Sequence, residues 1–222
     1  MTARIERLAP EQKQTLQKAS VLGRVFQERV LRHLHEPASQ SRFEHLLLEL
    51  QRREFVQAQQ QQAFEARALE NGDYIFKHAI THDVAYHSML LAKRKPLHAL
   101  AARALENLYP DRLEELAATL GYHFERAEAR REAAHYLGRA AERAQATFAN
   151  AEALVFYRSA LTQLERIDHG KQDVNTRRTG AHLHEGLGDV LTLTGDHVEA
   201  SSSKDWIQSQ PATALRGDRA RL

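Results

Sequence analysis

The sequence predicts a mainly α-helical fold, and three observations support this. Alanine, leucine, glutamate, arginine and glutamine dominate the 222 residues, and all five are good helix formers. Only 10 glycines and 5 prolines interrupt them. Apolar residues recur at helical spacing over most of the chain. With 42% hydrophobic and 27% charged residues, the composition is ordinary for a globular protein.

Composition also excludes several classes of function. The formal net charge of +2 is too small to indicate nucleic-acid binding by itself. The chain has no cysteine, which excludes disulfides, thiolate chemistry and cysteine-ligated zinc. No apolar run reaches the ~18–20 residues that a membrane-spanning helix needs, and the first residues lack the apolar core of a signal peptide. We therefore expect a cytoplasmic protein with no membrane contact.

The first part of the chain predicts three short helices. One begins at Pro10 and ends near Leu22, before Gly23, because proline is favoured in a first turn and glycine after a last one. A second spans about Gln27–His33. A third runs from about Ser41 to Arg53 and has four apolar residues on one face, namely Phe43, Leu46, Leu47 and Leu50.

The apolar period then changes. Phe55-Val56 predicts a short strand, Gln57–Gln62 a polar loop, and Tyr74–Phe76 a second strand that leads into a helix ending near Leu91. Lys77-His78 stands where this strand meets this helix. Three short helices followed by a two-stranded hairpin are the order of a winged helix, which we expect to span residues 1–93.

Everything from Pro96 to about residue 200 predicts helices. Successive apolar stripes suggest a solenoid of helical hairpins over residues 94–200. Leu187-Gly188, Gly195-Asp196 and Ala200 fit a tetratricopeptide pattern, as does the segment around Ala153. The two alanines are farther apart than the ~34-residue standard repeat, so we expect elongated repeats. From Ser201 the stripe fails, which predicts an irregular or disordered tail over 201–222 and an uncovered apolar face near Leu183–Thr194.

The chain resembles the middle region of bacterial STAND-type regulatory ATPases. The resemblance lies in two segments, Ala3–Phe26 and Tyr74–Ala127, and in the repeats that follow them. In that family an AAA-like ATPase domain precedes a winged helix and tetratricopeptide-like repeats, and many members carry a class III adenylate or guanylate cyclase domain. The resemblance covers residues ~3–200 and implies a role in signal transduction. The chain contains neither a phosphate-binding loop nor assignable cyclase aspartates. We therefore expect a fragment or stand-alone remnant of such a regulator, in which ATP or ADP would bind only to the parent protein's ATPase domain.

His78 is the one candidate site residue. By the resemblance it matches the histidine of a Met-His-Asp motif that contacts the nucleotide phosphate in the resting state, although Ala79 stands where that motif has aspartate. An imidazole N–H can donate to a phosphate oxygen. The simpler interpretation is a histidine that bonds a nearby carbonyl at a strand end, and this interpretation is favoured because the chain lacks a nucleotide-binding domain.

Other interpretations carry less weight. His78 and His82 have the spacing of two zinc ligands on a helix, but Ala79 replaces the general-base glutamate of an H-E-x-x-H motif. Residues 42–53 would be the recognition helix of a DNA-binding winged helix, but Glu44 and Glu49 would repel phosphate. We do not expect nucleic acid or a metal to bind.

The sequence thus predicts a non-catalytic regulatory module with no cofactor of its own. We expect it to couple the nucleotide state of an upstream ATPase domain to a partner on the repeat surface, either a protein or peptide or a small effector. Two alternatives stay open, a DNA-binding winged-helix transcriptional regulator and a fragment of an ATP-binding adenylate or guanylate cyclase.

Overall fold

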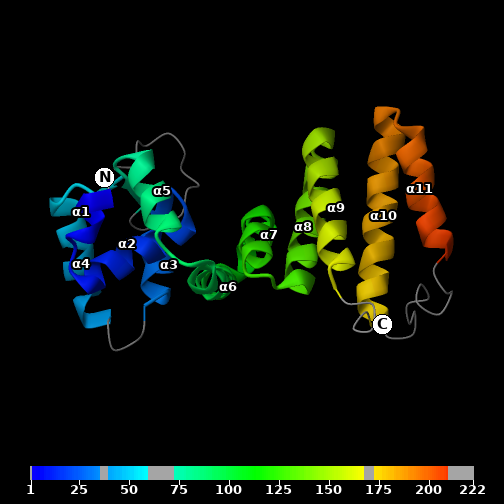
Figure 1. Cartoon of the computed structure of the whole chain (residues 1–222). Helices are drawn as coiled ribbons and strands as arrows, with labels where there is room; N and C mark the ends of the chain where they lie inside the picture. The colour runs from blue at the N-terminus through cyan, green and yellow to red at the C-terminus, as the bar shows by residue number, and fades with distance from the viewer. Residues whose placement is uncertain (1, 36–39, 60–72, 168–172, 210–222) are drawn as a thin grey trace. The chain divides into compact units, whose positions relative to one another are not determined.

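The structure is a computed structural model that describes residues 2–35, 40–59, 73–167 and 173–209 (Figure 1). The chain divides into two compact units, Met1–Pro110 and Asp111–Leu222. The boundary expected at residue 93 lies within the first of these units. The helix that contains this residue, α6 (Leu91–Leu108), packs on α2 (Pro10–Leu22) and α3 (Glu28–His33). The described part of the chain is mainly helical, as predicted, with one small sheet.

The first unit combines helices with a three-stranded antiparallel sheet in the order β1-β3-β2. β3 lies in the centre, where Ile75 pairs with Val25 of β1 and Phe76 pairs with Val56 of β2. In chain order, the elements before α6 are α1 (Thr2–Glu6), α2 (Pro10–Leu22), β1 (Val25–Gln27), α3 (Glu28–His33), α4 (Gln40–Arg52), β2 (Val56–Ala58), β3 (Asp73–Phe76) and α5 (Ala79–His87).

Local sequence explains the ends of α2. Pro10 occupies the first helical turn, where its missing N–H would have no partner, and Gln12 Oε1 accepts a hydrogen bond from the Ala9 N–H at 3.2 Å. Gly23 ends the helix at φ +121°, a conformation that L side chains rarely adopt. This sharp ending turns the chain directly into β1.

Two predictions for the first unit are wrong. The expected two-stranded hairpin is a three-stranded sheet, because Val25–Gln27 forms β1, a strand too short to show an alternating pattern. Pro96 does not separate two helices but lies inside α6. It stands near the helix start and costs one backbone hydrogen bond. The actual break comes at Ser88, whose Oγ donates to the Ala85 carbonyl at 2.7 Å.

The core of the first unit gathers aromatic and leucine side chains from α2, α4 and the sheet. Phe26 lies between Tyr74, which stacks on it at 5.8 Å, and Phe76, which meets it edge-on at 5.7 Å. Fully buried members of the core include Leu16, Leu31, Phe43, Leu50 and Phe76. The sheet is therefore anchored to the helices through its central strand.

The second unit is a run of antiparallel helices, each packed on the next. After a 3-10 turn at Pro110–Arg112 come α7 (Ala117–Arg126), α8 (Arg130–Ala146), α9 (Asn150–Glu165), α10 (Val174–Thr194) and α11 (His197–Ser209). A similar close contact occurs twice in this run. A Cβ on Gly121 would lie 2.8 Å from Leu137, and a Cβ on Gly138 would lie 2.8 Å from Leu183. Each glycine thus lets a leucine of another helix approach.

The prediction of an irregular tail from Ser201 is wrong for residues 201–209, which belong to α11. The buried face of α11 uses small and polar residues, Ala200 and Ser203, so it gives no apolar stripe. Trp206 packs over Gly180, where an added Cβ would lie 3.0 Å from the ring. Leu183, Leu187 and Leu191 are buried, so the prediction of an uncovered apolar face around them is also wrong. Residues 210–222 lie outside the described residues.

None of the helices in the described ranges is both long enough and apolar enough to cross a membrane.

Two glycines of α10 give a matched test of this packing. A methyl group at Gly188 would meet Ser203 Cβ at 3.6 Å and Ala200 O at 3.8 Å, both ordinary contacts, whereas one at Gly186 would overlap the Tyr157 ring. We expect Gly188→Ala to raise the free energy of unfolding by up to about 1 kcal/mol through helix propensity, and Gly186→Ala to lower it by about 1–3 kcal/mol. Urea unfolding followed by fluorescence of Trp206, the single tryptophan, measures both in the second unit. Equal effects of the two changes would contradict the packing described.

Candidate functional site

The predicted site residue, His78, lies between β3 and α5, where the chain turns from strand to helix. It is the N-cap residue of α5 with extended backbone angles (φ −131°, ψ 133°). Its carbonyl accepts the Thr81 N–H at 2.9 Å, but its side chain makes no capping hydrogen bond. The ring is exposed. His78 therefore presents its imidazole to solvent at the end of the central strand.

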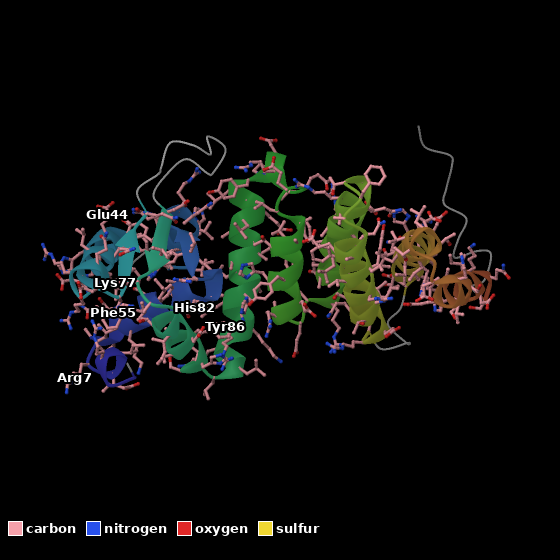
Figure 2. The ribbon with its side chains drawn as sticks, turned by 90° about the horizontal axis from the view of Figure 1, so that it is seen from above. Arg7, Glu44, Phe55, Lys77, His82 and Tyr86 are labelled. Atoms are coloured by element: carbon pink, nitrogen blue, oxygen red, sulfur yellow. The ribbon has the colours of Figure 1, made fainter. Side chains whose placement is uncertain are left out.

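The neighbouring Lys77 forms an ion pair across the same corner. Its Nζ donates to Glu54 Oε1 at 2.6 Å, while its backbone N–H donates to the Phe55 carbonyl at 3.1 Å (Figure 2). Glu54 adopts φ 60°, which turns the chain sharply between α4 and β2. The Lys77 hydrogen bond lowers the pKa of Glu54, with smaller electrostatic contributions from Arg4 and His78. His78 thus stands beside a carboxylate, and Lys77 already has an anionic partner.

His82, one helical turn further along α5, has a structural role. Its Nε2 lies 3.0 Å from the Ser20 carbonyl of α2, and its Nδ1 lies 2.9 Å from Asp83 Oδ1. The ring meets Phe76 edge-on at 5.3 Å and stacks parallel to Tyr86 at 6.3 Å. Both ring nitrogens are therefore engaged, which leaves His82 unsuited to be a metal ligand in this conformation.

Tyr86 continues this contact network into α6. Its hydroxyl lies 3.0 Å from Nε2 of His98, which is fully buried, and the Arg94 guanidinium lies 4.8 Å from the centre of its ring. Arg94 Nε also donates to the Met89 carbonyl at 2.9 Å, which helps to hold the α5–α6 turn. Sequence reasoning missed this role of His98. His98 lies within an apolar helical stripe of the sequence, and this position could have predicted that its side chain is buried.

The metal interpretation finds no support from geometry. Within the described residues there is no group of three or more His, Asp or Glu side chains that could hold a metal ion.

The outer face of α4, the candidate recognition helix, carries paired charges. Arg42 Nη1 lies 3.4 Å from Glu11 Oε1, and Arg52 Nη1 lies 3.0 Å from Glu49 Oε1. Glu44 lies on the same helix and pairs with Arg32 of α3 at 3.2 Å. Exposed pairs of this kind are weak. Even so, the acids reduce the positive potential that a DNA-binding helix needs.

In the second unit, α8 and α10 share a polar surface. Glu142 Oε1 of α8 lies 2.7 Å from Nε2 of His182 on α10, and both side chains are exposed. His135 lies two turns before Glu142 on the same face of α8. We call these three residues the α8–α10 face. It is a surface on which side chains from two successive hairpins come together, so we take it as the candidate partner site.

Two other histidines of the second unit are buried, as His123 is, or partly buried, as His184 is. His123 is 2% exposed, and burial lowers its pKa to about 4. His184 stacks on Trp206 at 4.2 Å, and burial lowers its pKa as well. Both rings are therefore neutral near pH 7 and act as packing groups.

No family model, no curated protein and no solved structure matches this chain. The resemblance to STAND regulators thus rests on the residues and motifs of the sequence itself.

Alanine substitutions of His78 and His82 test which of these two side chains stabilises the fold. His82→Ala removes the contact with the Ser20 carbonyl and the packing on Phe76, so we expect a loss of about 1–3 kcal/mol in the free energy of unfolding. His78→Ala, the matched control, should change it by no more than about 0.5 kcal/mol because the ring is exposed. Urea unfolding followed by circular dichroism, with hydrogen exchange across α5, measures both. A large loss in His78→Ala would show that its ring is structural.

Burial of His123 predicts a pH-dependent stability. The unfolded ring has a pKa of about 6.5, so between pH 6.5 and 4 the unfolded state binds more protons than the folded one. The stability is complete above this window and falls as the pH decreases, by about 2 kcal/mol at pH 5 for this residue. Urea unfolding at pH 7 and pH 5, followed by Trp206 fluorescence, should show this loss. His123→Leu should reduce the difference between the two pH values, and an unchanged difference would exclude His123 as its source.

Proposed function

We propose that this chain is a non-catalytic regulatory module of the STAND type, in which a winged-helix-like unit is joined to tetratricopeptide-like helical hairpins that bind a partner. The partner would be a protein or peptide, or a small effector, on the α8–α10 face. The observation that carries the proposal is the stacking of the second unit, in which each of the helices α7 to α11 packs on the next. A run of helices that each pack on the next is typical of a repeat architecture, and such architectures expose extended binding surfaces.

The element order of the first unit supports the winged-helix assignment. Three helices, α2, α3 and α4, precede two antiparallel strands, with β1 between α2 and α3 and with β3 central in the sheet. In a regulator of this kind the winged helix contacts an ATPase domain and the repeats contact the effector. A module with this function would transmit a nucleotide state without catalysing a reaction.

His78 would serve as the nucleotide-phosphate sensor in a protein that also contains the ATPase domain. Its exposed ring can donate to a phosphate oxygen. The residues around it fit this role only in part, because Lys77 is paired and Glu54 is an anion beside the ring. The remaining phosphate contacts, and ATP or ADP itself, would therefore belong to that other domain.

A photo-reactive amino acid placed on the α8–α10 face tests the partner site. At position 135, on α8, it should give a discrete cross-linked product in a cell extract, because this face is proposed to contact the partner. At position 165, exposed on α9, the same group is the matched control and should give none. The second measurement is fluorescence anisotropy with a random DNA duplex. Binding that weakens steeply with salt and in Arg52→Ala would favour a DNA-binding regulator and overturn the proposal.

A further inference from the structure

A groove between the last two helices has no helix packed in it among the described residues. α10 and α11 lie side by side (Figure 1). The groove that they form has a volume of about 550 Å³. Small residues, Ala181 and Gly188, lie on its α10 side, and Ile207 lies on its α11 side. Charged residues surround these, namely Arg178, Glu185 and Asp189 from α10 and Lys204 from α11.

The preceding hairpin shows what such a groove can accept. There, α10 packs on both α9 and α8, and Leu183 of α10 lies against Gly138 of α8. A glycine in the wall of the groove allows this close approach. Gly188 of α10 is among the residues that line the groove one hairpin later, although it is itself buried.

Gly188 is buried where α10 packs on α11. A Cβ on Gly188 would make only ordinary contacts with Ser203 and Ala200, whereas a Cβ on Gly186 would overlap Tyr157. Glycine inside a helix costs about 1 kcal/mol relative to alanine. No tight contact among the described residues requires glycine here, but the Cβ direction of Gly188 faces α11 of the same chain, so this position does not indicate which helix enters the groove.

The charges along α10 indicate which helix this is. Arg178 and Asp189 are equally distant in sequence from the point between Leu183 and His184. His182 and Glu185 are equally distant from the same point. That point is close to the middle of α10. In two antiparallel copies of one helix, residues related in this way lie opposite each other. The first half of the exposed stripe is basic and the second half is acidic, so the pattern is complementary to its own reversed copy.

We propose that the α10–α11 groove binds α10 of a second copy of this chain, forming a two-fold antiparallel dimer. Arg178 of each copy faces Asp189 of the other. Glu185 lies opposite His182, whose Nε2 is also 2.7 Å from Glu142 of its own chain, so the Arg178–Asp189 pairs are the main attraction. The same surface serves both copies, as in an isologous interface, so the assembly closes at two chains. This inference does not depend on the proposed function. It also differs from dimerisation through the apolar residues Leu183, Leu187 and Leu191, since these are buried in each copy.

Reciprocal charge reversal tests the dimer. Sedimentation of the full chain over the micromolar range should show a monomer–dimer equilibrium that weakens at high salt, because the pairs are exposed. Arg178→Glu places like charges opposite each other at two points in a homodimer, and so does Asp189→Arg, so each variant alone should be monomeric. An equimolar mixture of these two variants restores both pairs in a heterodimer and should sediment as a dimer. The double variant should likewise dimerise with itself.

Asp205→Lys is the matched control, because Asp205 is exposed on α11 but does not line the groove. It should dimerise as the unmodified chain does. Circular dichroism should show that all variants keep their helical content. A chain that is monomeric throughout the concentration range overturns the proposal. Dimers that persist in Arg178→Glu, or a mixture of the two single variants that stays monomeric, overturn it as well.

Discussion

The second unit depends on the close approach of its helices at positions that carry no side chain. Gly121 and Gly138 each receive a leucine of another helix, and Gly186 receives the ring of Tyr157. The Tyr157 ring is 2% exposed, its hydroxyl donates to Gln145 Oε1 at 2.7 Å, and burial raises its pKa to about 12. Because a side chain at any of these glycines would push two helices apart, the spacing of the whole run follows from them. The outer faces are then free to carry polar residues, and the α8–α10 face is one of these.

In the first unit, the corresponding constraint is the central strand. β3 bonds to both other strands, and its Phe76 contacts Phe26 and His82. From there the contacts continue through Tyr86 to His98 of α6. This network determines where α5 begins and so fixes the backbone of His78 at the strand end. The backbone of His78 therefore caps α5 at the end of the strand, while its ring is exposed.

The sequence predicted those elements whose ends and faces are marked locally. Pro10 and Gly23 delimit α2, and the apolar stripes of α8 and α9 predict both helices. It also placed His78 at the strand-to-helix corner. It could not predict β1, which is too short to show a period, or α11, whose buried residues Ala200 and Ser203 are not apolar enough to form a stripe. The structural role of His82 was missed for a similar reason, since its partner, the Ser20 carbonyl, is distant in sequence.

α10 shows how the functions of one helix can be separated by its faces. Leu183, Leu187 and Leu191 face the interior, and Gly180 and Gly186 admit the rings of Trp206 and Tyr157. Three glycines in one helix reduce its intrinsic stability by about 3 kcal/mol. The contacts at Gly180 and Gly186 offset part of this, because each admits an aromatic ring that buries a large apolar surface. Gly188 is buried on α11, where an added Cβ would make only ordinary contacts with Ser203 and Ala200. The exposed face of α10 differs from both of these, because its charges are complementary to their own reversed copy. This symmetry, and not the glycines, is the basis of the proposed contact with α10 of a second copy.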